Sequence, residues 1–177
     1  MPRFHFAAAF GAVLAFPLAA SAHITLEKQQ AAVGGSYKAV FRVPHGCGGS
    51  PTVAIRIKIP DGVISVKPQP KPGWKVATVK AAYAKPYKLY GDTLTEGVTE
   101  VDFTGGNLPD EFYDEFVVST YVTADLKPGD ALYFPVVQEC ASGTERWIEI
   151  PALGKKAQES ERPAPSVTLT PAAGDGD

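Results

Sequence analysis

Apolar and polar residues alternate with a period of two along most of this chain. The clearest case is the stretch 52–59, in which four aliphatic residues at odd positions alternate with polar ones such as Arg56 and Lys58. Strict alternation over four to eight residues is typical of a strand with one buried face. No stretch shows a convincing helical period. The pattern therefore predicts an all-β fold.

Eight further segments have the composition of strands and are separated by turns rich in Gly and Pro. They cover residues 24–27, 36–43, 63–66, 74–79, 98–103, 112–122, 131–139 and 146–150. Short strands at regular spacing, with no crossover helix between them, are typical of an antiparallel β-sandwich. We expect a sandwich of the immunoglobulin or cupredoxin type with Greek-key connections.

The last two segments should form a hairpin around residues 141–144. With a four-residue turn, Cys140 would lie opposite Glu145, and Gln138 opposite Trp147. This register puts Trp147 and Cys140 on one face of the hairpin and Glu139 on the other. It therefore favours Trp147 over Glu139 as a site residue.

The ends of the chain differ from its middle. Arg3, an apolar run over residues 4–20 and small residues at Ala20 and Ala22 match a secretory signal peptide of residues 1–22, cleaved after Ala22. From about residue 155 the chain is polar and rich in Pro, with few large apolar residues, so residues 155–177 are expected to be a disordered tail. The folded domain should then span residues 23–154.

Composition limits the choice of partners. Cleavage after Ala22 would remove Arg3 and no acidic residue, changing the formal charge from −2 to −3. Weak acidity without a block of basic residues argues against nucleic acid or anionic lipid as the main partner. No second apolar run approaches the roughly 20 residues needed to cross a bilayer. These features predict a protein that is soluble in the bacterial periplasm or outside the cell.

The chain has two cysteines, Cys47 and Cys140. In an oxidising compartment the default for such a pair is a disulfide. The alternative is a pair of thiolate ligands for a soft metal ion. A disulfide would bring the Cα atoms within about 6 Å of each other and pull the loop that carries His45 against the hairpin that carries Trp147.

His23 would become the first residue after cleavage. A histidine at a free N-terminus offers two nitrogens, the α-amine and ring Nδ1, that can close a chelate ring on a metal ion. The ordinary pKa values are about 8 for the amine and 6.5 for imidazole, so both can lose protons to a metal near neutral pH. The competing interpretation is that cleavage leaves a histidine there by chance.

His45 is the second histidine that cleavage would leave, in a Gly-rich loop two residues before Cys47. A loop histidine is often a surface residue, and a tryptophan at a strand end often only packs. Met1 is the only methionine, and cleavage would remove it. If the two cysteines are oxidised, only nitrogen and oxygen atoms remain as metal donors. Amine and imidazole nitrogens in a roughly planar arrangement suit Cu(II) best, followed by Ni(II) and Zn(II).

Several motifs occur in a characteristic order along the chain. They are His-Ile-Thr-Leu at 23–26, Val-Pro-His-Gly-Cys at 43–47, Ile-Pro-Asp-Gly-Val at 59–63, Lys-Pro-Gly-Trp at 71–74, and Gln-Glu-Cys at 138–140 followed by Trp147. In this order they resemble the YcnI-like domain family, also called DUF1775.

The resemblance extends from His23 to about Pro151. It implies an exported β-sandwich that handles copper and binds Cu(II) through His23 as a bidentate ligand, with Trp147 beside the metal. Gram-positive members of the family carry a glutamate after the Val-Pro pair and a C-terminal membrane anchor. This chain instead has His45-Gly46 at that position, and we expect His45 to replace the carboxylate as the second ligand.

Three classes of function remain open. The first is a non-enzymatic Cu(II) chaperone or buffer in copper homeostasis, whose partners are copper and other periplasmic copper-handling proteins. The second is a copper-dependent oxidase or oxygenase, because a histidine brace with an open position can activate oxygen. The third is an interaction module that binds no metal.

Overall fold

The computed structural model describes residues 23–152 and 160–172 of the chain. The regular secondary structure in these residues consists of strands, which confirms the predicted all-β class. The strands are β1 Thr25–Leu26, β2 Gln30–Ala32, β3 Gly35–Val43, β4 Thr52–Lys58, β5 Val63–Pro68, β6 Lys75–Leu89, β7 Asp92–Leu108, β8 Asp114–Val122, β9 Ala131–Tyr133, β10 Val136–Cys140, β11 Thr144–Trp147 and β12 Ser166–Thr170.

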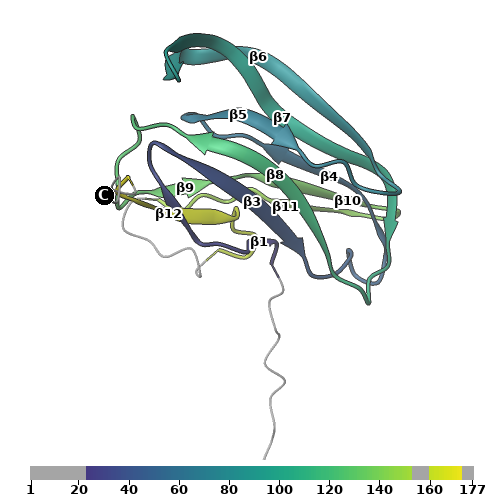
Figure 1. Ribbon diagram of the computed structural model, residues 1–177. Coiled ribbons are helices and arrows are strands. Elements are labelled where there is room, and N and C mark those ends of the chain that lie inside the picture. The colour runs from purple at the N-terminus through teal and green to yellow at the C-terminus, as the bar shows by residue number, and fades with distance from the viewer. Residues whose placement is uncertain (1–22, 153–159, 173–177) are drawn as a thin grey trace, which may run out of the picture.

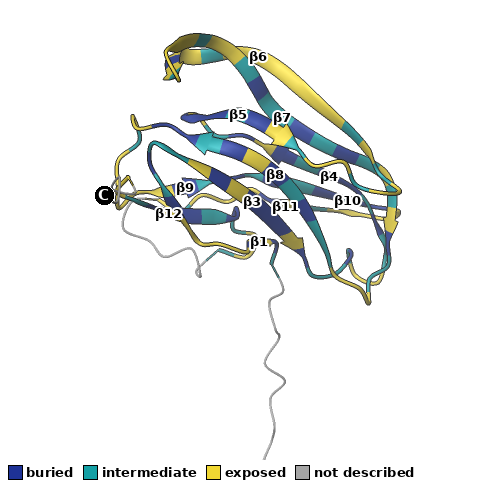
Figure 2. Cartoon of the chain, viewed as in Figure 1, coloured by how far each residue is buried: buried dark blue, intermediate teal, exposed yellow. Residues whose placement is uncertain are grey.

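Two antiparallel sheets form the sandwich (Figure 1). One has four strands in the order β1-β3-β8-β5, and the other has five in the order β11-β10-β4-β7-β6. Their inner faces supply a core of aliphatic and aromatic side chains, as alternation along the strands requires (Figure 2). Phe103 of the five-stranded sheet meets Phe116 of the four-stranded sheet with ring centroids 5.1 Å apart.

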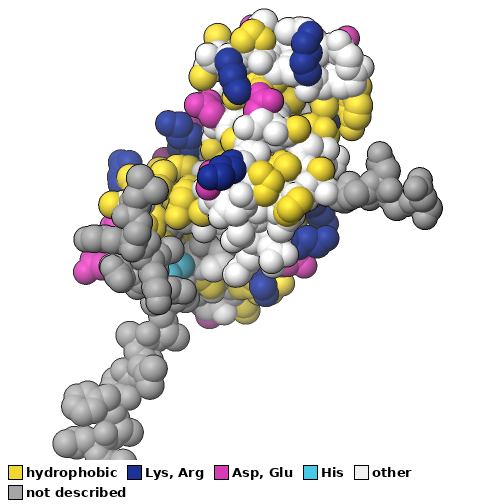
Figure 3. Space-filling model, turned by 90° about the vertical axis from the view of Figure 1, so that its left-hand side faces the viewer, with side chains coloured by type: hydrophobic (Ala, Val, Ile, Leu, Met, Phe, Trp, Pro, Cys, Tyr) yellow, Lys and Arg dark blue, Asp and Glu magenta, His cyan; other side chains and the backbone are white. Residues whose placement is uncertain are grey.

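The β6–β7 hairpin extends beyond the rest of the sandwich (Figure 1). We expected short strands at 74–79 and 98–103, but the two strands continue to the turn at Tyr90-Gly91. Most residues of β6 are exposed on both faces because the outer part of this arm has no sheet opposite it (Figure 2). Basic side chains lie apart from one another at this end of the molecule (Figure 3).

The expected strand 131–139 is divided into two. β9 pairs with β12, whereas β10 pairs with β4 and β11. The break falls at Phe134-Pro135, where proline has no backbone N–H to donate. The division sends β9 and β10 to different sheets.

The expected disordered tail is wrong for the residues described at the C-terminal end. β12 runs parallel to β2 and antiparallel to β9 in a third sheet of order β2-β12-β9. Val167 and Leu169 are buried with 1% and 3% of their surface exposed. Two apolar residues that alternate with threonines are enough to form a strand here, because β12 pairs on both sides, with the edges of β2 and β9. The domain therefore continues past residue 154 to Thr170.

Two expectations concern export. The signal peptide falls on residues 1–22, which lie outside the described residues. In the described ranges 23–152 and 160–172, no helix is long and apolar enough to cross a membrane.

The buried C-terminal strand predicts a measurable contribution to stability. Leu169→Ala should lower the free energy of unfolding by about 2–5 kcal/mol, the range for removing a buried leucine side chain. Its exposed neighbour provides the control, because Thr168→Ala should change stability by less than about 0.5 kcal/mol. Urea denaturation followed by circular dichroism measures both, and equal stability of Leu169→Ala and wild type would contradict the placement of β12.

Candidate functional site

A disulfide joins Cys47 to Cys140, as the cysteine count predicted. The two Cα atoms are 6.0 Å apart, and the bond spans 93 residues. It fixes the loop between β3 and β4 against the β10–β11 hairpin, in keeping with an exported protein. The disulfide also leaves no thiolate for a metal ion at these two positions.

The loop that carries His45 is tightly built. Gly46 donates its backbone N–H to Asp110 Oδ1 at 2.9 Å, and the backbone groups of Cys47 and Ser50 exchange two hydrogen bonds. A Cβ atom at position 46 would lie 2.0 Å from the Ser50 carbonyl oxygen. Glycine is thus required after His45, because a larger residue would push the loop away from the disulfide.

The hairpin register differs from the expected one by two residues. Trp147 lies opposite Val136, Gln138 opposite Glu145, and Glu139 opposite Thr144. Cys140 donates its N–H to the Gly143 carbonyl oxygen at 3.0 Å, so the turn contains only Ala141 and Ser142 and is tighter than the four residues we assumed. A shift of two keeps every side chain on its predicted face, so Trp147 shares a face with Gln138 and Cys140, all three buried.

Glu139 lies on the opposite face, as predicted. Its carboxylate accepts a hydrogen bond from Arg56 Nε at 2.7 Å. This bond to Arg56 lowers the pKa of Glu139 below its ordinary value. Glu139 is thus part of an ion pair on the outer face and does not belong to the candidate site.

His23 and Trp147 meet where edge strands of the two main sheets come together. His23 precedes β1, the edge strand of the four-stranded sheet, and Trp147 ends β11, the edge strand of the five-stranded sheet. Their ring centroids are 5.4 Å apart, with a T-shaped arrangement of the planes. The indole is buried with 5% of its surface exposed, whereas His23 is half-buried.

Gln138 holds this tryptophan and connects it to the His45 loop. Its Oε1 accepts a hydrogen bond from Trp147 Nε1 at 3.0 Å. Its Nε2 donates to the His45 carbonyl oxygen and to Thr52 Oγ1, each at 2.7 Å. Only 1% of the Gln138 surface is exposed, so these bonds satisfy an amide that would otherwise be costly to bury.

The ring of His45 has a defined tautomer. Its Nδ1 lies 2.5 Å from the Gly46 carbonyl oxygen. Because a carbonyl oxygen can only accept, Nδ1 carries the proton and Nε2 carries the lone pair in the neutral ring. Nε2 is therefore the nitrogen of His45 that could bind a metal ion.

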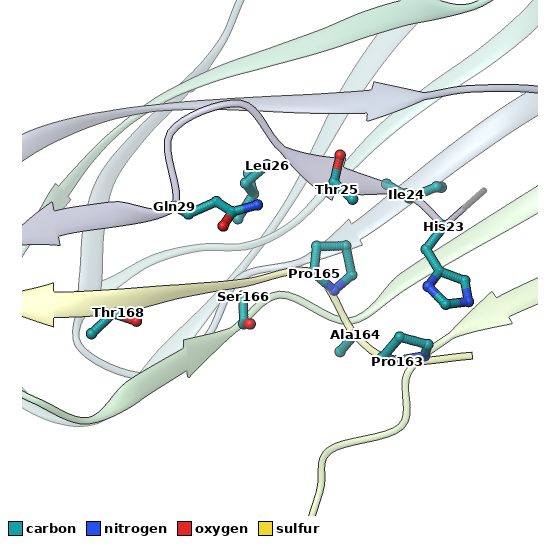
Figure 4. A pocket seen from close by; sticks show the side chains of 10 residues that line it. All are labelled: His23, Ile24, Thr25, Leu26, Gln29, Pro163, Ala164, Pro165, Ser166 and Thr168. Carbon is teal, nitrogen blue, oxygen red and sulfur yellow. The ribbon is translucent and has the colours of Figure 1, made fainter. Parts of the chain in front are cut away.

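A cleft of about 540 Å³ opens beside His23. One wall is the N-terminal strand, and the other is the C-terminal segment 163–168 (Figure 4). The His23 ring projects toward Pro163 and Ala164 at one end of the cleft, and Gln29 and Thr168 lie at the other end (Figure 4). The segment assigned from sequence to a disordered tail thus helps to form the site.

Backbone bonds hold the C-terminal segment beside the site. Glu149, two residues after Trp147, donates its N–H to the Arg162 carbonyl oxygen at 3.1 Å and accepts a bond from Ala164 N at 2.9 Å. Arg162 also forms an ion pair with Glu145 of β11. The segment therefore continues the pairing of the hairpin that carries Trp147.

Sequence reasoning missed two parts of the site, Gln138 and the C-terminal segment. A signal for Gln138 was present, because it occupies an inward position between Val136 and Cys140 in an alternating strand. A glutamine at such a position must find partners in the interior. For the C-terminal segment, the sequence signal was a short alternation of apolar and polar residues around Val167 and Leu169.

The donor atoms near His23 fit a copper(II) site with few protein ligands. His23 supplies an imidazole, cleavage before it would supply an amine, and the disulfide removes sulfur donors. Within residues 23–152 and 160–172, no group of three or more His, Cys, Asp and Glu side chains is arranged to hold a metal. A metal site at His23 would need further ligands besides side chains of these types, and cleavage before His23 would supply one as an amine.

Comparisons with known proteins support the fold. The chain is similar to an uncharacterized protein from Nocardia farcinica, whose crystal structure has an immunoglobulin-like fold, with 26% identity and a TM-score of 0.61 over 84% of this chain and 98% of that one. It also matches the seventh ScaB type I cohesin from Pseudobacteroides cellulosolvens, with 8% identity and a TM-score of 0.40 over 88% and 96% of the two chains. A search of curated proteins finds no match.

The fold and the site thus define an immunoglobulin-like β-sandwich with a histidine–tryptophan pair at the edge of its two sheets. Residues 23–169 match the family described as "Domain of unknown function (DUF1775)", and the chain belongs to that family. The match confirms the resemblance inferred from the motifs. It also includes β12 almost to its end, in agreement with the corrected domain boundary.

The central position of Gln138 can be tested by removing its polar group. Gln138→Leu should lower the free energy of unfolding by about 1–3 kcal/mol, because Trp147 Nε1 and the His45 carbonyl lose their partner in a dry environment. It should also change the near-UV circular dichroism of the tryptophans. Thr120→Val is the matched control, since it removes a buried hydroxyl that donates to the Tyr37 carbonyl on the four-stranded sheet. An unchanged near-UV spectrum for Gln138→Leu would contradict the assignment.

The disulfide predicts both a chemical and a thermodynamic result. Intact mass after alkylation without reduction should show no modified thiol, and two after reduction. Replacing both cysteines by alanine should lower the free energy of unfolding by about 4–5 kcal/mol on the chain-entropy model for a loop of this length. Two alkylated thiols in the unreduced protein would contradict the bond.

Proposed function

We propose that this protein is an exported Cu(II)-binding protein that buffers or delivers copper in the periplasm. The ion is cargo, and the N-terminal histidine of the cleaved chain holds it. The observation that carries this proposal is the contact of the His23 ring with the buried indole of Trp147. The resemblance to the YcnI-like family implied that Trp147 lies beside a metal bound by His23. The contact between the two rings supports this arrangement.

His23 provides the chelate. Cleavage after Ala22 converts its backbone nitrogen into an amine, and this nitrogen and Nδ1 of the same residue then bind side by side. Binding requires both groups to release their protons, so copper affinity falls as the pH decreases. Because both donors belong to one residue, the chelate needs little help from the fold.

Trp147 restricts one side of the ion without donating a lone pair. Its indole N–H is occupied by Gln138 Oε1, which fixes the plane of the ring against His23. A rigid apolar neighbour excludes water from that side and influences the spectrum and the redox behaviour of the metal. Gln138 supports the site in this way although it is not a ligand.

His45 is the proposed second ligand, through Nε2. The hydrogen bond of Nδ1 to the Gly46 carbonyl puts the proton of the neutral ring on Nδ1 and its lone pair on Nε2. With the amine and Nδ1 of His23 it would complete a set of three nitrogens. The disulfide and the Gln138 bond to the His45 backbone hold the loop that carries this ring.

Export supports the proposal from the sequence side. Residues 1–22 have the three parts of a signal peptide, and the disulfide suits an oxidising compartment. The expected partners are copper itself and other copper-handling proteins of the periplasm that give or receive the ion.

A copper-dependent redox enzyme is the second candidate, favoured by the cleft that opens beside His23. A histidine brace with an open position next to a cleft could present a substrate to the ion. Turnover of a substrate in the presence of a reductant, above that of free copper, would support this function. Failure of the processed chain to bind any divalent metal would support an interaction module instead.

The N-terminal site predicts an order of copper affinities. A chain that begins at His23 should bind one equivalent of Cu(II), and its electron paramagnetic resonance spectrum should show coupling to nitrogen. One additional residue before His23 converts the amine into an amide and should weaken binding by more than about tenfold, or ~1.4 kcal/mol. His45→Ala should weaken binding less than His23→Ala, because the chelate ring remains.

Trp147→Phe serves as the control for this series, since it should retain the ion and change its spectrum. Titration against a competing chelator ranks all the variants. Equal affinity of the extended and the processed chains would overturn the N-terminal site, and His45 with nearby carboxylates would then be the next place to examine.

A further inference from the structure

One wall of the cleft beside His23 is the edge of β1 that does not pair with another strand. β1 pairs with β3 through Thr25 opposite Arg42 and Leu26 opposite Phe41. In the described part of the chain, no ladder joins β1 to the C-terminal segment across the cleft. The backbone bond from Thr168 N to the Gln29 carbonyl, at 2.9 Å, closes the far end of the cleft.

Alternation along β1 determines which backbone groups face this space. Glu27 donates its N–H to the Val40 carbonyl of β3. Because backbone groups of successive residues point to opposite sides of a strand, those of Ile24 and Leu26 point away from β3. Both residues line the cleft although their side chains are buried in the core, with 1% and 2% exposed. One wall therefore offers N–H donors and carbonyl acceptors.

The opposite wall has a different chemistry. Pro163 and Pro165 have no N–H to donate, and polar side chains along the cleft besides His23 are the hydroxyls of Thr25, Ser166 and Thr168 and the amide of Gln29. The volume of about 540 Å³ lies within the roughly 300–1,000 Å³ of small-molecule sites. A small ligand with both a carboxylate or carbonyl group and an amine would fit these walls.

A ligand of this kind could reach a copper ion held at the end of the cleft where His23 lies. Cu(II) with nitrogen and oxygen donors prefers four positions in a plane. The amine and Nδ1 of His23 and Nε2 of His45 would fill three of them. The described residues contain no cluster of three or more His, Cys, Asp and Glu side chains arranged for a metal. Water would otherwise fill the remaining position, and a ligand bound in the cleft beside His23 can replace it.

We propose that the cleft binds an amino acid or the N-terminal residue of a peptide, which completes the coordination of the copper held by His23. This inference rests on the proposed function. The α-amine of the ligand releases its proton to solvent and binds the metal. Its carboxylate or first carbonyl accepts hydrogen bonds from the edge of β1 and from Ser166 or Thr168. The cargo is then a copper chelate and not a bare ion.

The test uses the chain that begins at His23, loaded with one equivalent of Cu(II). Glycine represents free amino acids, and Gly-Pro-Gly represents a peptide terminus whose second residue has no amide N–H that copper could displace. Titration with glycine should produce a saturable change in the electron paramagnetic resonance spectrum with one more coupled nitrogen, and ¹⁵N-glycine should alter that coupling. Acetate, which has no amine, should not add a nitrogen.

Variants of the cleft provide the second part of the test. Ser166→Ala with Thr168→Val should weaken glycine binding about fivefold or more, because the ligand loses its hydrogen bonds to the two hydroxyls. Their affinity for Cu(II) alone should not change, since neither side chain is a ligand. Thr78→Ala, on the exposed arm, is the matched control for both measurements.

The outcomes separate this inference from the proposed function. If the processed chain does not bind Cu(II), the proposed function fails. If it binds Cu(II) but glycine and Gly-Pro-Gly leave the spectrum unchanged or merely remove the metal, the cleft is not a ligand site and this inference is overturned. Equal glycine affinity in wild type and the cleft variant would overturn it as well. Tighter binding of Gly-Pro-Gly than of glycine would identify a peptide terminus as the ligand.

Discussion

The buried amide of Gln138 is the contact on which the arrangement of the site depends. Its two donors and its acceptor reach the His45 loop, β4 and Trp147, which come from three separate parts of the chain. A buried amide must satisfy both its oxygen and its nitrogen, so these partners cannot move independently. The disulfide two residues further on holds the same loop covalently. Together they keep the indole of Trp147 in a fixed position against which the His23 ring rests.

A second constraint is that the exposed edges of the sheets must be covered. β1 and β11 are edge strands, and unpaired edges invite pairing with other chains. The C-terminal segment covers the edge that continues from β11, through the bonds of Glu149 to Arg162 and Ala164. It then leaves that edge and becomes β12 between β2 and β9. The cleft lies where this crossing passes β1 without pairing to it, so the site is a consequence of how the chain closes its own edges.

Much of the fold could be predicted from the sequence because alternation is a local signal. The buried stretch around Ile55 and Ile57 and the exposed positions of Arg56 and Lys58 show it clearly, and a disulfide between the only two cysteines follows from their number. The predicted hairpin register was wrong by two residues, yet the faces of Trp147 and Glu139 were right, since only an odd shift exchanges faces. Local patterns thus determine which side a residue faces more reliably than what lies opposite it.

The remaining features depend on tertiary context that a single sequence does not contain. β12 has only Val167 and Leu169 as large apolar residues, and its stability comes from free edges on β2 and β9, which lie far away in the chain. The outer part of the β6–β7 arm shows the opposite case, because it extends a ladder whose residues are mostly exposed, with Tyr87 as a buried exception. Backbone pairing between the two strands, and the hydrogen bond from Gly62 N to the Tyr87 hydroxyl, hold the arm where little side-chain surface is buried.

In the proposed copper site, His23 provides the affinity for the ion, and the surrounding fold provides the selectivity for what else can reach it. A chelate made by the amine and imidazole of one residue would bind copper even in a short peptide, so the fold contributes little to that pair of bonds. The fold instead determines what surrounds them: the indole held by Gln138 on one side, and the cleft between β1 and the C-terminal segment on another. In the proposed copper site, the first would limit the approach of water, and the second would limit which outside ligands reach the ion. Trp147 and Gln138 come from the β10–β11 hairpin, and one wall of the cleft continues into β12. The surroundings of His23, near the start of the domain, are therefore built by residues near its end.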